Sequence, residues 1–492
     1  MAQLWDYLVV GSGAGGSAAA SRLAKSGASV LLVEKGLPLP TDGSTLDADT
    51  VVTRGAFLAR EPWLDRTGQV VFPEEHFNLG GKTKWYGAAL LRFDPHELEA
   101  DPAHGCLAWP LGYAELAPWY EEAERLLGVQ RFAVEPGLRR IVDGLRRQDG
   151  GWREAALQVG LAPDILAHPL EARHFDGFAS AAGLKSDAET LLGPVRRHAN
   201  LRVLTGAAVR ALLPSPDAPE RVVGVECEDG QRHEARRVIL AAGALHSPRL
   251  LQTYFRQTGL DERLPAARNV GRNYKFHVLT AMIAFSPRRV TDVLCKTALL
   301  LHDALPHSSV QTLGGNLAAE IVRAQAPGFV PRRLVDIVAG RGYGLFLQTE
   351  DGSHPDNRVI AGEGDAPPRL DYDPARVPEA VVEHTRLVAT LRRQLRRLGY
   401  MAVAQPIPVT GTAHCCGTLV TGADPATSVV DPEGRVHGMQ NLYVADGSVL
   451  PRMSRVNPAL TIYAWGLRLA AALADQGRRH ERTAAAADPV RA

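Results

Sequence analysis

A glycine-rich loop near the N-terminus constrains the fold of this chain more than any other feature. The loop reads Gly11-Ser-Gly13-Ala-Gly15-Gly16 and follows an apolar run at 7–11 (YLVVG) that is typical of a buried parallel strand. Residues 17–26 favour a helix, and residues 29–35 (SVLLVEK) predict the next strand. The segment therefore predicts a β-α-β unit, the opening unit of a Rossmann-like fold.

The loop has the spacing G-x-G-x-x-G, in which each glycine has a separate role. Gly11 permits a tight turn, Gly13 lets the backbone approach a pyrophosphate, and Gly16 allows the helix to pack closely on the strand. The phosphates would lie on free N–H groups from Ala14 onward, where the helix dipole favours negative charge. We interpret the loop as a dinucleotide site; the alternative is a purely structural glycine turn.

The second expected strand ends at Glu34 and Lys35, about twenty residues after the glycines. An acid at this point can accept hydrogen bonds from a ribose, and it disfavours a 2′-phosphate. NADP is therefore not expected. The motif by itself leaves the choice between FAD and NAD open.

Length and composition limit the remaining classes of protein. The 492 residues exceed one ordinary core and predict two or three interlocked domains. A net charge of +1 gives no basic footprint for nucleic acid, and no apolar run reaches the ~20 residues that span a bilayer. Five cysteines without a CxxC pair argue against a disulfide framework, and the first ten residues show no signal-peptide pattern. We expect a cytoplasmic protein with small-molecule partners; the sequence leaves the oligomeric state open.

The pattern along the chain mixes helices with strands. Helix-forming composition predicts helices at 113–127 (despite Pro118), 183–198 and 376–398. From residue 201 onward alternating apolar segments predict strands, with Asp229-Gly230 as a hairpin turn. Residues 476–492 are rich in arginine and alanine without apolar periodicity, and we expect a flexible tail.

Three segments of the first 280 residues carry a more specific signal. They are FNLGGKTKWYGAALLR (77–92) with Gly80-Gly81, Thr83 and Tyr86-Gly87, VILAAGALHSP (238–248) with Ala242-Gly243, and VGRNYKFH (270–277). They resemble the FAD-binding blocks of the glucose–methanol–choline (GMC) oxidoreductases, where small residues let backbone amides reach the isoalloxazine. Val209 falls where this family places a backbone contact to adenine.

Three C-terminal blocks resemble the same family in the same order. They are His414-Cys-Cys-Gly417-Thr418, Tyr443-Val-Ala-Asp446-Gly447-Ser448 and Asn457-Pro458-Ala459-Leu-Thr461. In the family, the aspartate lies beside the pyrophosphate and ribityl chain. The Asn-Pro-x-x-Thr block begins a helix whose N-terminus points at the flavin pyrimidine, where the helix dipole favours negative charge. The likeness runs from residue 5 to about 475.

The resemblance implies FAD as the cofactor, without a metal, and a mixed α/β fold. A Rossmann-like FAD-binding domain would be interleaved with an antiparallel-sheet substrate-binding domain. We expect the discontinuous FAD domain at 1–100, 180–275 and 405–475, and the substrate-binding domain at 101–179 and 276–404.

His414 and Asn457 lie 43 residues apart, a separation typical of the family's catalytic pair. Hydride leaves a carbinol carbon only as the hydroxyl proton leaves, so a base must reach that oxygen, and a neutral imidazole suits this task. We therefore expect His414 to be the base. Asn457 would orient the same oxygen; asparagine before proline is also good helix-capping chemistry, and both roles can hold.

Other polar residues of these blocks leave alternatives open. The loop at 77–92 contains no histidine of the kind that some relatives link covalently to the flavin, so we expect dissociable FAD. Cys415 and Cys416 lack a nucleophile–base arrangement and are interpreted as packing residues. Glu350 is either a carboxylate that contacts substrate or an acid in an exposed turn.

The resemblance implies oxidation of an alcohol carbon. Polar Lys82, Lys84 and Tyr86 in the flavin loop favour a sugar- or polyol-like substrate. We expect a dehydrogenase that passes electrons to an acceptor other than oxygen. An oxidase that makes hydrogen peroxide and a non-redox lyase that retains FAD are the alternatives.

Overall fold

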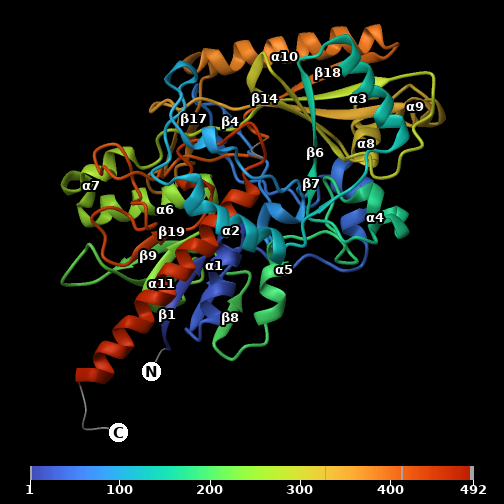
Figure 1. The fold of residues 1–492 in the computed structure, drawn as a ribbon. Coiled ribbons are helices and arrows are strands. Elements are labelled where there is room, and N and C mark those ends of the chain that lie inside the picture. Colours follow the sequence, from blue (N-terminus) through green and yellow to red (C-terminus); the bar gives the residue numbers. More distant parts are fainter. Residues whose placement is uncertain (1–2, 327, 412–413, 488–492) are drawn as a thin grey trace.

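The computed structural model describes residues 3–326, 328–411 and 414–487, and a partly parallel sheet carries the glycine loop (Figure 1). The order of this sheet is β8-β2-β1-β11-β10-β9, with β19 also paired to β11. β8, β2, β1, β11 and β19 run parallel, and β9 and β10 form an antiparallel extension. The strands are β1 (Leu4–Val10), β2 (Val30–Val33), β8 (Leu201–Leu204), β9 (Val209–Pro214), β10 (Val222–Cys227), β11 (Arg232–Leu240) and β19 (Leu442–Val444).

The register of the parallel strands brings their carboxyl ends level. Val10 pairs with Val33 on one side and with Leu240 on the other, and Leu240 pairs with Val444. The loops that follow these four strands therefore emerge at one edge of the sheet. Ligands of open parallel sheets bind at this edge, so the register gathers the expected cofactor segments.

Helices α1 (Ala14–Lys25) and α11 (Ala459–Ala487) pack against each other beside this sheet. Glycines make the crossing close: an ideal Cβ on Gly466 would lie 2.5 Å from the carbonyl oxygen of Gly15. Helix α11 continues to Ala487, so residues 476–487 are helical where we expected a flexible tail. Alanine and arginine are strong helix formers, and this propensity is present without apolar periodicity.

The second large sheet is antiparallel throughout, in the order β18-β12-β15-β14-β13-β6. Helix α10 (Pro378–Arg397) lies along it at one end of the molecule and buries its leucines on the sheet (Figure 1). Val278 and Ser308 both pair with Thr349, so the residues next to them, His277 and Glu350 among them, lie at the same end. The strands are β6 (Trp152–Ala156), β12 (Val278–Phe285), β13 (Ala298–His302), β14 (Leu305–Thr312), β15 (Gly342–Thr349) and β18 (Met401–Ile407).

Smaller elements connect the two sheets. Four short strands form a sheet in the order β16-β17-β3-β4, and β5 pairs with β7. These strands are β3 (Trp63–Leu64), β4 (Val70–Val71), β5 (Gln130–Arg131), β7 (Gln158–Val159), β16 (Arg358–Ile360) and β17 (Arg369–Asp371). The remaining α-helices are α2 (Tyr113–Leu126), α3 (Pro136–Gln148), α4 (Pro169–His174), α5 (Ala188–Leu192), α6 (Gly243–Thr258), α7 (Leu260–Arg263), α8 (Gly315–Gln325) and α9 (Arg332–Ala339).

The mixed α/β architecture, the hairpin at Asp229-Gly230 and the helices expected at 113–127 and 376–398 are confirmed. The helix expected at 183–198 is wrong at both ends: α5 covers Ala188–Leu192, a 3-10 turn follows at Gly193–Val195, and residues 183–187 and 196–198 are not helical. Asp187 caps α5 by accepting the N–H of Glu189, and Lys185 makes an isolated β-bridge with Leu161 before that cap. Within the described ranges, none of the helices combines the length and the apolar character needed to cross a bilayer.

Candidate active site

A cavity of about 1150 Å³ opens where the carboxyl edge of the parallel sheet faces the antiparallel sheet. The loops after β1, β2, β11 and β19 line one side, and Ala281, Gln311 and Phe346 of the antiparallel sheet line the other. Every residue that we expected to bind FAD or to act in catalysis lies on the cavity wall except Gly16 and Gly80. Segments far apart in the sequence therefore meet at one site.

The glycine loop has separate steric demands at each position. Gly11 has φ 101°, in the left-handed region, and an ideal Cβ on Gly16 would lie 2.0 Å from the oxygen of Gly11. An ideal Cβ on Gly15 would lie 1.6 Å from the carbonyl oxygen of Ala445, a constraint that the motif did not reveal. Gly13 has φ −63°, and its ideal Cβ meets no protein atom within 4 Å. Only at Gly13 does the missing side chain leave room that opens into the cavity.

Glu34 joins two of the cavity loops to each other. Its Oε2 accepts the N–H of Ser12 at 2.9 Å and the Ser12 hydroxyl at 2.6 Å, and its Oε1 accepts the N–H of Gly36 at 2.8 Å. Burial raises the pKa of this carboxyl, although these hydrogen bonds oppose the shift. These hydrogen bonds use both lone pairs of Oε2 and one of Oε1, so Oε1 can accept one more and a ribose contact is compatible with this arrangement. Lys35 next to it forms an ion pair with Glu61.

The flavin-type loop packs directly on the glycine loop. The N–H of Gly80 donates to the hydroxyl of Ser12 at 2.8 Å, and an ideal Cβ on Gly81 would lie 3.6 Å from the Cα of Gly13. The hydroxyl of Thr83 donates to the carbonyl oxygen of Gly80 at 2.6 Å. The two loops thus form one surface, joined by the Ser12 hydroxyl and by the close approach of Gly81 to Gly13.

Asp446 lies on the same cavity wall, directly after the residue that packs on Gly15. Its Oδ2 accepts the N–H of Gly243 at 2.9 Å, and its Oδ1 accepts the N–H of Ser448 at 2.9 Å. Burial raises the pKa of this carboxyl, against the effect of these hydrogen bonds. Gly243 has φ 83°, which favours glycine, and Val209 lies farther along the same wall.

His414 and Asn457, which lie far apart in the sequence, are in contact. The Nδ2 of Asn457 lies 3.1 Å from the Nε2 of His414, and the Oδ1 of Asn457 accepts a hydrogen bond from Nε2 of Gln311 on β14. Burial lowers the pKa of His414 well below its usual value near 6.5, and the nearby charges of Lys296 and Lys82 add to this. The imidazole is therefore neutral at physiological pH and can accept a proton.

The sequence analysis did not predict the residue that contacts Nδ1 of His414. The Nδ1 of His277 lies 3.0 Å from the Nδ1 of His414, and its Nε2 lies 2.8 Å from the carbonyl oxygen of Ser454. His277 ends the family-like block 270–277, and Gln311 lies in a segment that carries no motif. The histidine in a recognised block was a signal that could have identified His277, whereas nothing in the sequence singles out Gln311.

A buried ion pair was also missed. Lys296 Nζ lies 3.0 Å from Asp176 Oδ2, both side chains line the cavity, and each is only 6% exposed. An ideal Cβ on Gly87 would lie 2.1 Å from Lys296 Nζ and 2.2 Å from Asp176 Oδ1. Gly87 therefore makes room for the pair beside Tyr86, on the wall that holds His414.

Glu350 fits neither of the two alternatives that the sequence left open. It is fully buried and does not line the cavity; it accepts hydrogen bonds from Arg452 Nε at 2.9 Å and Nη2 at 3.0 Å. Burial opposes ionisation, but hydrogen bonds from His307 and Arg452 hold the pKa of Glu350 at about 2. Glu350 is therefore a structural residue, because its negative charge is paired within the protein.

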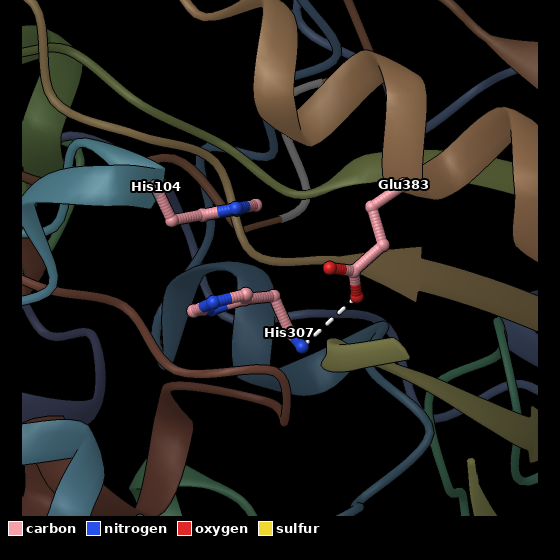
Figure 2. Close-up of side chains that lie close together, drawn as sticks. All are labelled: His104, His307 and Glu383. Carbon is pink, nitrogen blue, oxygen red and sulfur yellow. Dashed lines mark hydrogen bonds between the residues drawn. The ribbon is translucent and has the colours of Figure 1, made fainter. Parts of the chain in front are cut away.

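His307 extends this network toward the surface. Its ring lies between Glu350 and Asp101, at 3.2 Å from each, and it stacks on His104 with ring centroids 3.7 Å apart and planes 8° apart. Figure 2 shows the two parallel rings and the hydrogen bond from the backbone N–H of His307 to Glu383. Parallel rings do not direct their lone pairs at one point, so this arrangement suits an ion-pair network rather than a converging set of metal ligands.

Besides His414, two histidines lie on the cavity wall outside the loop at 77–92. His76 stacks on Trp85, with ring centroids 4.9 Å apart, and His246 lies 3.6 Å from a carboxylate oxygen of Glu75. The nearby Lys82 is ion-paired with Glu75. The expectation of dissociable FAD rested on the absence of histidine from the loop alone, and it stays a prediction.

Comparisons with known proteins match most of the chain. Residues 5–279 and 364–466 match the two domains of the GMC oxidoreductases. Paromamine 6'-oxidase of Streptomyces fradiae is 33% identical over 97% of this chain and 93% of the relative, and 6'''-hydroxyparomomycin C oxidase of Streptomyces lividus is 31% identical over 96% and 92%. The crystal structure of pyridoxine 4-oxidase superposes with a TM-score of 0.69 at 20% identity, covering 95% of this chain and 99% of that chain.

The extent of these matches decides the family. The match to the N-terminal domain alone covers more than half of the 492 residues, and the relatives above 30% identity span nearly the whole chain. The open space beside Gly13 and the close approach of the two glycine loops fit a dinucleotide. The chain belongs to the GMC oxidoreductases and is an FAD-dependent oxidoreductase.

Proposed function

We propose that this enzyme oxidises a hydroxyl-bearing carbon of an amino-sugar-like substrate, with His414 as the base and Asn457 as the group that orients the reacting oxygen. The observation that carries this proposal is the contact between the two side chains on the cavity wall. The pair presents one hydrogen-bond acceptor and one donor at the same point. A substrate hydroxyl needs both of these when it loses its proton.

His414 accepts the hydroxyl proton at Nε2. Its lowered pKa keeps the ring neutral at physiological pH, so that one of its two nitrogens is free to accept a proton. Asn457 donates its Nδ2–H to the same substrate oxygen, which stabilises the negative charge that develops there. Gln311 holds Asn457 in this orientation because its Nε2 donates to the Oδ1 of Asn457. The substrate hydroxyl would thus replace the direct hydrogen bond between Asn457 and His414 and bond both side chains.

The glycine loops would hold the cofactor at the carboxyl edge of the parallel sheet. The loop 11–16 and Glu34 would hold the pyrophosphate and ribose, and the loop 80–87, Asp446 and the start of α11 would hold the flavin end. FAD, when bound, supplies the acceptor for the hydride. In this division the FAD domain comprises 1–100, 180–275 and 405–475, and the substrate-binding domain comprises 101–179 and 276–404.

The substrate class rests on two supports. The two Streptomyces relatives are named for paromamine and hydroxyparomomycin, which the names place as their substrates. The cavity wall near His414 carries the buried Asp176–Lys296 pair, and such groups suit a ligand with hydroxyl and amino groups better than an apolar alcohol. We further propose a cytoplasmic location, supported by cysteines that are all free in the described chain.

The electron acceptor separates two candidate functions. The first candidate is the dehydrogenase expected from the sequence, which passes electrons to an acceptor other than oxygen. The names of the two Streptomyces relatives favour the second candidate, an oxidase that reduces O2 to hydrogen peroxide. Turnover of one accepted substrate in air, compared with turnover in the presence of a quinone or dye, decides between the two. A faster rate with the dye supports the dehydrogenase, and an equal or faster rate in air establishes the oxidase.

The decisive experiment is anaerobic mixing of the enzyme with amino sugars, neutral sugars, polyols, choline and long-chain alcohols, followed by flavin absorbance. We expect amino sugars to bleach the flavin fastest. His414→Ala should keep FAD but slow bleaching by roughly 10²–10⁴-fold, the usual contribution of a general base. His198→Ala, an exposed histidine away from the cavity, is the control. Bleaching by choline or long-chain alcohols alone would overturn the substrate class, and a wild-type rate in His414→Ala would overturn the base.

A further inference from the structure

A chain of hydrogen bonds links His414 to a backbone carbonyl on the side away from the cavity. Nδ1 of His414 lies 3.0 Å from Nδ1 of His277, and Nε2 of His277 lies 2.8 Å from the carbonyl oxygen of Ser454. The two rings meet edge to face, with planes 81° apart and centroids 4.9 Å apart. Two nitrogens in contact require one donor and one acceptor, so one ring determines the protonation of the other.

The carbonyl oxygen of Ser454 settles which nitrogen carries the proton. A carbonyl oxygen only accepts hydrogen bonds, so Nε2 of His277 must carry hydrogen. Burial lowers the pKa of His277 to about 4, so the ring is neutral at physiological pH and its Nδ1 presents a lone pair. Nδ1 of His414 must then donate its hydrogen to His277. In a neutral His414 this leaves Nε2, the nitrogen beside Asn457, without a proton.

The contacts on the cavity side agree with this direction. Asn457 Nδ2 lies 3.1 Å from Nε2 of His414 and donates to it, and Oδ1 of Asn457 accepts from Nε2 of Gln311. Donors therefore point the same way from Gln311 through Asn457, His414 and His277 to Ser454. If any one side chain reversed, two donors or two acceptors would face each other within the chain, so the arrangement is self-consistent in one direction only.

The end of the chain is fixed by a buried charge. Ser454 is fully buried and has φ 65°, a conformation that non-glycine residues adopt only when their surroundings impose it. Its N–H donates to Oε1 of Glu350 at 2.9 Å, and Arg452 holds the same carboxylate through two hydrogen bonds. Glu350 and Arg452 therefore hold the backbone of Ser454 from its N–H side, and the carbonyl oxygen of the same residue faces His277.

We propose that His277 is a positioning residue that holds His414 in the tautomer with an unprotonated Nε2, and that Glu350 supports it through the backbone of Ser454. The proposal rests on the function proposed above, since only a base needs this tautomer. A purely structural alternative is that His277 fills buried space beside the cavity. The two roles make different demands on a residue that is substituted for His277. To fill space, the new side chain needs only a similar volume. To fix the tautomer of His414, it needs a hydrogen-bond acceptor at the position of Nδ1.

Asparagine and leucine form a matched pair for this question because they have nearly the same shape. In His277→Asn, Oδ1 can still accept from Nδ1 of His414, and in His277→Leu nothing can. We expect flavin reduction to be 10²–10⁴-fold slower in His277→Leu, the scale of a wrong histidine tautomer, and less than about 10-fold slower in His277→Asn. His384→Leu is the control, because His384 is a buried histidine that bonds Thr280 and Thr349 and does not contact His414.

A spectroscopic readout makes the test independent of turnover. In holoenzyme labelled with ¹⁵N-histidine, protonated and bare ring nitrogens have well-separated shifts, and His414→Ala identifies the His414 signals. We expect a protonated Nδ1 and a bare Nε2 for His414 in the wild type and in His277→Asn, and a mixture of tautomers in His277→Leu. FAD content and far-UV circular dichroism confirm that each variant is folded.

The outcomes distinguish this inference from the proposed function. A His414 protonated at Nε2 in the wild type, or the same tautomer in all three proteins, would overturn the role of His277 while leaving His414 as a candidate base. Equal rates in the asparagine and leucine variants would overturn it as well. By contrast, wild-type flavin reduction in His414→Ala would overturn the proposed base, whatever tautomer the spectra show.

Discussion

Replacing Gly13 by alanine should separate FAD binding from folding. Its backbone, φ −63° and ψ −171°, is open to any residue, and an added Cβ meets no protein atom within 4 Å. Replacing glycine by alanine reduces the conformational entropy of the unfolded chain and thereby stabilises the folded protein by about 0.4–1 kcal/mol. Alanine caps the N-terminus of α1 less well than glycine, which offsets this gain by a similar amount. We therefore expect the unfolding free energy of the protein without FAD to change by less than about 1 kcal/mol.

FAD binding should respond differently, because the added methyl group occupies the space that we assign to the pyrophosphate. Overpacking of this kind costs about 1–3 kcal/mol, which corresponds to about 5–150-fold weaker binding. Titration of the stripped protein with FAD, followed by quenching of flavin fluorescence, measures the dissociation constant. Thermal unfolding of the same samples without FAD measures stability.

Gly15→Ala is the matched control two residues later. Its Cβ would lie 1.6 Å from the carbonyl oxygen of Ala445, a backbone atom that cannot rotate away. This variant should lose stability even without FAD, whereas Gly13→Ala should not. Wild-type FAD affinity in Gly13→Ala would refute the placement of the pyrophosphate, and a large loss of stability in that variant would refute the steric reasoning.

Three further predictions concern charge, acid and the cofactor bond. Asn457→Asp should slow flavin reduction in rapid mixing without loss of FAD, because a carboxylate repels the charge that develops on the substrate oxygen; an unchanged rate would contradict the role of Asn457. The stability deficit of His384→Leu should shrink by about 3 kcal/mol between pH 7 and pH 4, measured by urea unfolding. Burial lowers the pKa of His384 to about 4 in the folded protein, whereas in the unfolded chain this histidine binds a proton below about pH 6.5. Acid therefore favours unfolding of the wild type through His384 and has no such effect in His384→Leu. A stability difference between the two proteins that stays constant from pH 7 to pH 4 would contradict the lowered pKa. Acid precipitation should release the flavin into the supernatant; colour that stays with the protein until His76 or His246 is replaced would show a covalent bond instead.

The local signals of the sequence predicted the first β-α-β unit well. Strand β1, the glycine loop and helix α1 are contiguous, so their spacing contains the geometry, and the parallel register then gathers the later blocks at the same edge. The residues 183–187 were assigned to a helix because composition does not reveal that Asp187 begins it or that Lys185 bridges to Leu161.

The substrate side was predicted less completely. Gln311, Lys296 and Asp176 come from three separate segments that antiparallel pairing and packing bring to the cavity, and none of them has a sequence motif. Glu350 looked like a residue of a cavity edge or a turn because its strand ends there, but its partner Arg452 lies 102 positions away. Long-range partners of this kind are set by the tertiary fold and leave no periodic pattern.

The glycine crossing of α1 and α11 has a mechanical consequence for the site. Helix α1 begins at the loop assigned to the pyrophosphate, and α11 begins two residues after Asn457. Because the α11 glycine at 466 lies directly against the oxygen of Gly15, neither helix can shift along the other without a clash. The same rigid pair of helices therefore supports both the end of the cavity assigned to the pyrophosphate and the end assigned to the substrate. A side chain added at position 466 would be expected to disturb affinity for the cofactor and alignment of the substrate together, at a place that touches neither.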